Sequence, residues 1–220
     1  MNYLNQLLLD FKHKENFKDE DFYVSNCNYY AFNLINSWPK WEKKFLNICG
    51  EKFSGKSHLT NIFLKKFKGI KINASFFRNK NLQELKVYEN IILDNLDLNV
   101  DENLIYSLFN IIDQDNKYLI INSKIPVNEI NFKLEDLRSR TKNCLIAKIE
   151  KPDDDLMFAL ILKNFSDRQI TIDKKLIDFI IKRVDRSYGK IFEFIYKIDE
   201  LSLKKKKPID FKSIKDVLKV

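Results

Sequence analysis

Two kinds of hydrophobic pattern alternate along the chain up to about residue 150. Short apolar runs rich in β-branched and aromatic residues predict five strands. The expected strands are residues 45–49, 70–73, 91–93, 118–122 and 144–149. Between them, the segments 59–67 and 104–112 place their apolar residues at the spacing of one helical face. Strands that alternate with helices favour an α/β fold, in which helices cover both faces of a parallel sheet.

The pattern becomes wholly helical after Lys151. Pro152 and the three aspartates that follow it are typical of a helix start, because proline fits the first turn and acids favour the positive end of the helix dipole. Helices are expected at 153–165, 173–185, 190–203 and 210–218. The lysine run 204–207 is interpreted as a solvated turn. The sequence thus predicts an α/β core over 15–150 and a helical domain over 151–220.

Composition limits the classes of protein that fit. The chain has 220 residues, of which 45% are apolar and 32% charged, as is typical of soluble globular proteins. Lys and Arg number 39 against 31 Asp and Glu, and this excess is spread over both predicted domains, so charge alone argues only weakly for nucleic-acid binding. The sequence has no apolar run that could span a membrane and no secretory signal pattern. Its three widely spaced cysteines, Cys27, Cys49 and Cys144, suit a reducing cytoplasm.

The strongest local motif is the stretch 50–57, GEKFSGKS, which matches the phosphate-binding pattern G-x-x-x-x-G-K-[ST]. A predicted strand leads into it and a predicted helix leads out. Gly50 and Gly55 allow backbone N–H groups, including that of Ser54, to curl around phosphate oxygens. Lys56 is expected to neutralise the β- and γ-phosphates, and the Ser57 hydroxyl to bind Mg²⁺. The alternative is a chance match in a surface loop.

A second acid for the metal is expected at the end of a neighbouring strand. Asp94 follows the run 91–93 and fits this role; the alternative is that it caps a turn. Asn95 comes next, where ATPases of the AAA+ class usually carry the carboxylate that activates the attacking water. Because an amide cannot accept a proton at neutral pH, we expect the site to bind nucleotide but to hydrolyse it slowly alone. Asn122, at the end of the fourth predicted strand, is a candidate sensor of the γ-phosphate.

In this order the motifs resemble the AAA+ domain of the bacterial replication initiator DnaA, and most of all the short Hda group of DnaA regulatory inactivators. The resemblance covers nearly all of the chain. It includes residues 21–24 (DFYV), 55–59 (GKSHL), 93–95 (LDN), 134–140 (LEDLRSR) and 151–153 (KPD). It implies an AAA+ P-loop core with a five-stranded parallel sheet in the order 5-1-4-3-2, a C-terminal helical lid, and either ADP or ATP as the bound nucleotide.

The resemblance also implies roles for single residues. Arg140 matches the arginine finger that one subunit places against its neighbour's γ-phosphate, with Arg138 as the alternative. Lys190 lies where the family has its sensor 2 arginine, and lysine keeps the charge but loses the planar fork. His58, which follows the P-loop serine as in the family, joins the expected nucleotide-binding residues.

Two features distinguish the sequence from the initiators. Residues 74–90 are too few for the helical insertion that contacts single-stranded DNA in DnaA, so that function is not carried over. The sequence ends at Val220, where DnaA continues into a helix-turn-helix domain. We therefore expect no sequence-specific binding of duplex DNA.

An N-terminal peptide precedes the predicted core. Residues 6–11, QLLLDF, resemble the sliding-clamp-binding hexapeptide Q-L-x-L-x-[LF]. In that motif the Gln6 amide reaches backbone groups of the clamp, while Leu7, Leu9 and Phe11 fill apolar pockets. Residues 1–14 are therefore predicted to bind the sliding clamp, the β subunit of DNA polymerase III; the alternative is that they pack on the chain's own surface.

The predicted function is that of a regulatory adaptor. Held on the clamp, the protein would dock Arg140 on ATP-bound DnaA, promote hydrolysis of that ATP and so restrain the initiation of replication. A DnaA-related ATPase that loads a helicase is the alternative, although Asn95 and the clamp-like peptide argue against it. A small-molecule kinase would need a cluster of substrate-binding arginines in the lid, which the sequence lacks. A homodimer is left open, and no membrane partner is expected.

Overall fold

A five-stranded parallel sheet forms the centre of the core. The computed structural model describes residues 22–205 and 208–218. The strands are β1 (Phe45–Cys49), β2 (Gly69–Asn73), β3 (Asn90–Leu96), β4 (Tyr118–Ser123) and β5 (Leu145–Lys148). They pair in the order β2-β3-β4-β1-β5, with every pairing parallel, which confirms the predicted order when it is counted from the opposite edge.

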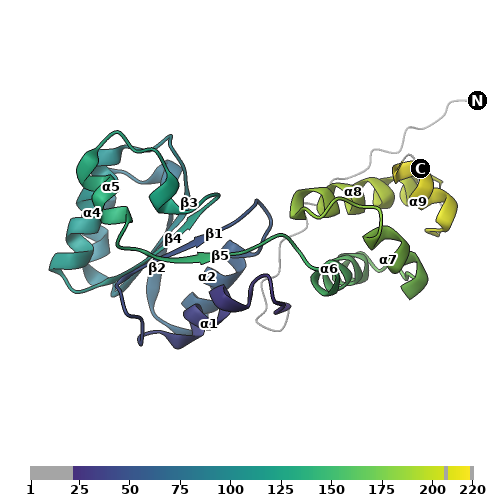
Figure 1. Cartoon of the computed structure of the whole chain (residues 1–220), viewed down its shortest axis with the longest axis horizontal. Coiled ribbons are helices and arrows are strands. Elements are labelled where there is room, and N and C mark those ends of the chain that lie inside the picture. The colour runs from purple at the N-terminus through teal and green to yellow at the C-terminus, as the bar shows by residue number, and fades with distance from the viewer. Residues whose placement is uncertain (1–21, 206–207, 219–220) are drawn as a thin grey trace, which may run out of the picture.

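Helices cover both faces of this sheet (Figure 1). The helices α1 (Tyr29–Ser37) and α2 (Lys56–Lys66) lie on one face, and α4 (Glu102–Gln114) and α5 (Glu135–Thr141) on the other. Each face has its own apolar cluster. Phe45 belongs to the cluster under α4, and the next residue, Leu46, to the cluster under α1 and α2. Successive strand residues point to opposite faces, so a continuous apolar run fills both clusters at once.

The connection between β2 and β3 is short. It consists of η2 (Ala74–Phe76), α3 (Asn79–Glu84) and η3 (Leu85–Val87). A further single turn, η4 (Val127–Glu129), follows β4. The strands β2 and β3 pair in parallel, with Asn73 opposite Asp94, so their carboxyl ends lie at the same edge of the sheet.

The C-terminal part of the described chain is helical and lies beside the sheet, beyond the end of β5 (Figure 1). It contains α6 (Asp154–Asp167), α7 (Lys174–Ile181), α8 (Tyr188–Lys205) and α9 (Phe211–Leu218). These helices pack around their own apolar cluster, which includes Met157, Ile161, Phe165 and Ile191. Asp153 caps α6, since its carboxylate accepts the N–H of Leu156 at 2.8 Å. In the described residues, no helix combines the length and the apolar surface that crossing a membrane requires.

Most helix boundaries in this helical part differ from the sequence-based expectation by one or two residues, and one differs by four. The helix α7 ends at Ile181, four residues earlier than expected, and α8 begins at Tyr188, two residues earlier. The early start of α8 has a clear cause, because the Tyr188 N–H donates to the carboxylate of Glu51 at 3.2 Å. A cap supplied by a residue so far away in the chain leaves no local signal in the sequence.

Tyr188 fastens the helical part to the core. Its side chain is 1% exposed and packs in the apolar cluster under α1 and α2, although the residue begins α8. Its hydroxyl donates to the carbonyl of Glu150 at 3.0 Å and lies 3.7 Å from the Cys27 thiol. Burial, with a smaller effect of Cys27, raises the pKa of Tyr188, so the hydroxyl stays a neutral donor.

The three cysteines are free thiols in buried positions. Burial raises the pKa of Cys49 to about 11 and that of Cys144 to about 12. Thiols with such raised pKa values are poor nucleophiles at neutral pH. Cys49 and Cys144 therefore serve as small apolar side chains of the core.

Loss of the Tyr188 anchor should destabilise the fold. Tyr188→Ala is expected to cost about 3–5 kcal/mol of unfolding free energy because it leaves a large cavity. Tyr188→Phe keeps the ring and removes one hydrogen bond, for a loss of about 1 kcal/mol. Urea unfolding followed by circular dichroism measures both. Tyr196→Ala is the matched control, because Tyr196 lies on the same helix and is exposed. Equal losses at the two positions would contradict the anchoring role.

Candidate nucleotide-binding site

The P-loop connects β1 to α2, and both of its glycines are needed for its shape. Gly50 has φ +156° and Gly55 has φ +94°. A Cβ on Gly50 would lie 2.9 Å from the carbonyl oxygen of Ile149, and one on Gly55 would lie 3.0 Å from the ring of Phe22. A side chain at position 50 would collide with the backbone of Ile149, and one at position 55 would be crowded by Phe22 in a left-handed conformation that favours glycine. The pattern G-x-x-x-x-G is therefore a requirement of this turn.

Lys56 lies curled inside the loop. Its ammonium donates to the carbonyl oxygens of Gly50 at 2.8 Å and Glu51 at 2.6 Å, and lies 3.4 Å from the hydroxyl of the buried Ser54. Burial lowers the pKa of Lys56, opposed by the attraction of Asp94. The positive charge is thus held by backbone carbonyl oxygens at the place where the motif would bind phosphates.

The predicted acid and sensor meet next to this loop. The Ser57 hydroxyl donates to Asp94, at 3.1 Å from Oδ2 and 3.3 Å from Oδ1. The Asn122 amide donates to Asp94 Oδ1 at 2.9 Å. Three residues from α2, β3 and β4 therefore come together, because the carboxyl ends of parallel strands share one edge of the sheet.

A fourth residue of this group, Lys71, was missed by the sequence analysis. Its ammonium lies 2.9 Å from Asp94 Oδ2 and also contacts Thr60 Oγ1 at 3.4 Å and Asn61 Oδ1 at 3.1 Å. Burial favours a raised pKa for Asp94, but the hydrogen bonds from Asn122, Lys71 and Ser57 and the Lys71 charge outweigh it and hold the pKa below its ordinary value. In the sequence, Lys71 lies between two isoleucines, which is the ordinary pattern of a strand with one solvent-facing side. No local signal therefore indicated that Lys71 belongs to the site.

The residues predicted to hold Mg²⁺ do not form a pure oxygen site. Ser57 and Asp94 supply the hydroxyl and carboxylate oxygens that magnesium prefers. The Lys71 ammonium, however, already contacts Asp94 Oδ2 at 2.9 Å. A divalent cation at that oxygen would face an adjacent positive charge, so these residues as arranged do not fit the ion. Across residues 22–205 and 208–218, no group of three or more His, Cys, Asp or Glu side chains is suited to a metal.

Asn95 lies at an irregularity of β3. Its φ is +58°, and the register between β3 and β4 shifts between Leu93 and Leu96. Asparagine tolerates this left-handed conformation better than most residues. The side chain is exposed at the end of an otherwise buried strand. An amide, not a carboxylate, therefore stands beside Asp94.

The P-loop also contacts the helical part, through two residues that the motif does not specify. The Glu51 carboxylate accepts the Ser187 hydroxyl at 2.9 Å as well as the Tyr188 N–H. The rings of Phe53 and Phe192 lie 5.1 Å apart. The phosphate-binding loop and the start of α8 are thus tied together, and no local pattern could have shown it.

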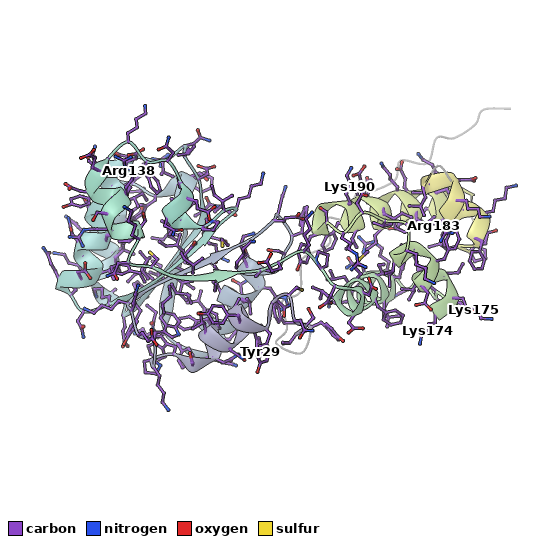
Figure 2. All side chains as sticks on the ribbon, viewed as in Figure 1. Tyr29, Arg138, Lys174, Lys175, Arg183 and Lys190 are labelled. Carbon is purple, nitrogen blue, oxygen red and sulfur yellow. The ribbon has the colours of Figure 1, made fainter. Side chains whose placement is uncertain are left out.

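Two other residues predicted to bind nucleotide, Lys190 and His58, lie outside the group around Asp94. Lys190, labelled on α8 in Figure 2, is 56% exposed and pairs with Glu193 at 2.9 Å, and this contact holds the pKa of Lys190 above its ordinary value. The ion-pair partner of Lys190 is thus a residue of the same helix. His58 lies edge-on to Phe22 at 5.3 Å, at the start of α2.

Both candidate arginine fingers lie on α5. Arg140 donates to Asp113 of α4 at 2.5 Å, lies 5.4 Å from the Tyr106 ring and is one-third exposed. Arg138 is 45% exposed and pairs with Glu135. Figure 2 shows Arg138 on the side of the core away from the helical part. The predicted clamp-binding residues Gln6, Leu7, Leu9 and Phe11 lie outside the described residues.

Sequence comparison relates the chain to replication initiators. No protein-family model matches it. The chain is 27% identical over 198 residues to the chromosomal replication initiator protein DnaA of Borrelia duttonii, and the match covers 78% of this chain and 41% of that protein. The chain thus spans less than half the length of that initiator. An uncharacterized protein of Haemophilus influenzae is 26% identical over 213 residues, covering 90% of this chain and 92% of that protein.

Structural comparison shows that the chain shares its fold with DnaA proteins. Domain III of the Thermotoga maritima replication initiation protein DnaA matches with a TM-score of 0.75 at 18% identity, over 94% of this chain and 97% of that chain. DnaA from Aquifex aeolicus bound to AMPPCP matches with a TM-score of 0.67 at 18% identity, over 87% of this chain and 66% of that chain. The chain therefore has the AAA+ fold of DnaA domain III and is similar in sequence to DnaA initiators.

Proposed function

We propose that this protein binds ADP or ATP in its P-loop and acts as a regulatory adaptor that promotes hydrolysis of DnaA-bound ATP. The observation that carries the proposal is the separation of two half-sites on one chain. The nucleotide-binding half lies at the P-loop, next to the helical part. The helix α5, which carries Arg138 and Arg140, lies on the side of the core away from the helical part (Figure 1), and Figure 2 shows Arg138 there. On this proposal, the α5 arginines complete a nucleotide site on a neighbouring molecule.

The nucleotide half-site is suited to holding a ligand. Lys56 is placed inside the loop, and Ser57 and Asn122 converge on Asp94. The AMPPCP-bound Aquifex relative supports an adenine nucleotide as that ligand. Asn95 cannot act as a base, so bound ATP would be hydrolysed slowly, and the role of the nucleotide would be to keep the loop and α8 together through Glu51.

The arginine half-site is suited to acting on a neighbour. The Arg140 guanidinium is partly exposed and its present partner, Asp113, is itself 43% exposed. An ion pair this exposed contributes little to stability and can exchange for a phosphate at small cost. The sequence relationship to DnaA supports an initiator molecule as the neighbour. The N-terminal hexapeptide would bring the protein to the clamp, which concentrates it near replicating DNA.

ADP should stabilise the protein through Lys56. At a concentration of about 100 Kd the expected gain in unfolding free energy is about 2.7 kcal/mol. Thermal unfolding with and without ADP measures it, and Lys56→Ala should abolish the ADP-dependent part. Lys66→Ala is the matched control, because Lys66 lies in the last turn of the same helix and its ammonium donates to Asn36 Oδ1 at 2.9 Å. An equal ADP effect in Lys56→Ala and wild type would count against the P-loop site.

Arg140→Ala should remove most of the stimulation of ATP hydrolysis on DnaA. In other nucleotidases an arginine supplied in trans contributes about 10³–10⁵ in rate by stabilising transition-state charge. The assay is single-turnover hydrolysis of labelled ATP on DnaA, with clamp on DNA. The variant should melt and bind ADP as the wild type does, because Arg140 lies outside the chain's own nucleotide site.

Arg138→Ala is the matched control for the finger, since it removes the same charge from the same helix. If Arg138→Ala loses stimulation and Arg140→Ala does not, the finger is Arg138. If neither variant loses it, or the wild type gives none, the adaptor function is wrong. Intrinsic turnover faster than about 1 s⁻¹, the low end for ordinary enzymes, would instead favour a helicase-loading ATPase.

Gln6→Ala should weaken retention by immobilised sliding clamp. The amide is the polar anchor of the hexapeptide, and its loss leaves only the apolar contacts. A pull-down with purified clamp compares it with wild type and with Gln83→Ala, which removes an exposed glutamine from α3. Equal retention of Gln6→Ala and Gln83→Ala would show that residues 6–11 do not bind the clamp.

A further inference from the structure

We propose that the ammonium of Lys71 supplies the positive charge that P-loop proteins usually take from Mg²⁺, so that this protein binds nucleotide without magnesium. The inference rests on the nucleotide binding proposed above, and it goes further by naming the residue that makes the site independent of a metal. It concerns Lys71 of β2 and its contacts with Asp94 and α2.

Lys71 is held in the way that a bound cation is held. Its ammonium contacts three oxygens: Asp94 Oδ2 at 2.9 Å, Asn61 Oδ1 at 3.1 Å and Thr60 Oγ1 at 3.4 Å. An ammonium has three N–H donors, so the three oxygens can satisfy it completely. Lys71 lies on the edge strand β2, where a lysine can extend freely into water. Its side chain instead is only 23% exposed and reaches the carboxylate.

The ammonium lies beside the P-loop serine. Asp94 Oδ2 accepts from Ser57 at 3.1 Å and is 2.9 Å from the Lys71 ammonium, so hydroxyl, carboxylate and ammonium meet at one oxygen. This is the pair of groups between which P-loop proteins place Mg²⁺. Lys71 therefore brings its charge to the region that the metal would occupy.

Asp94 has little capacity left for a second cation. Its Oδ1 accepts from Asn122 and Ser57, and its Oδ2 from Ser57 and Lys71. The carboxylate side chain is 9% exposed, and its single negative charge is already balanced by Lys71. In this poorly solvated place a divalent ion would gain little from the carboxylate and would be repelled by the ammonium.

Lys71 and Lys56 together give the site two positive charges. Lys56 lies inside the loop, bound to the carbonyl oxygens of Gly50 and Glu51, and Lys71 lies on the Asp94 side. Because Lys71 offsets the charge of the Asp94 carboxylate, the charge of Lys56 stays available to the phosphates of a nucleotide without a metal. The alternative is that the Lys71–Asp94 pair only joins β2 to β3, in which case it affects stability and has no influence on the metal requirement.

The test is binding of fluorescent mant-ADP in buffer with Mg²⁺ and in buffer with EDTA. For the wild type we expect the two dissociation constants to agree within about threefold, which is less than 1 kcal/mol. Lys71→Met keeps the apolar stem and removes the charge. It should bind about tenfold or more weakly in EDTA, a loss of about 1.4 kcal/mol or more, and recover when Mg²⁺ is added. Lys71→Arg, which keeps the charge, should bind in EDTA.

Lys148→Met is the matched control, because it makes the same change on β5 at an ion-paired, exposed lysine. Wild-type binding that weakens more than tenfold in EDTA would overturn the inference while leaving the nucleotide site intact. Equal binding of Lys71→Met and wild type in EDTA would also overturn it, and would leave the pair a structural link. If mant-ADP binds in neither buffer, the nucleotide proposal fails and this one with it. If Lys71→Met does not fold, the wild-type comparison still decides.

Discussion

The carboxylate of Asp94 is the interaction on which the candidate site depends. It sits at the end of β3 and is joined to α2 by Ser57, to β4 by Asn122 and to β2 by Lys71. A nearly buried carboxylate with fewer partners would be costly, because desolvation disfavours its charge. The four groups therefore stabilise one another. The parallel sheet makes this possible, since it delivers the ends of neighbouring strands to a single edge.

A second constraint couples the P-loop to the helical part. Glu51 and Phe53 belong to the loop, and their partners Ser187, Tyr188 and Phe192 lie at or near the start of α8. The anchor of Tyr188 in the core cluster fixes where α8 begins. A ligand that moved the loop backbone would therefore strain contacts with α8, so loop occupancy and the position of the helical part are mechanically linked.

Most of the fold could be predicted from the sequence, but the electrostatics of the site could not. Apolar runs gave the strands to within a few residues because both sheet faces are buried, and the strand order came from the DnaA resemblance. The motif led to Lys56, Ser57 and Asp94 because phosphate binding restricts the backbone locally. Lys71 and Glu51 escaped notice because their partners are distant in sequence. Each is a charged residue that composition alone assigns to solvent, and only tertiary packing pairs them.

The residues beside Asp94 determine whether this P-loop can hydrolyse ATP or only bind it. An enzyme that cleaves ATP uses a group that orients and activates water and a metal that draws charge from the phosphates as the bond breaks. In this chain the first position is Asn95, which cannot take up a proton. On the proposal made above, the second is the Lys71 ammonium, a fixed monovalent charge bound to Asp94. Both substitutions keep the attraction for a bound nucleotide and weaken the chemistry. On the adaptor proposal, such a chain contributes to hydrolysis by the groups it presents to another molecule, and the proposed groups are the arginines of α5.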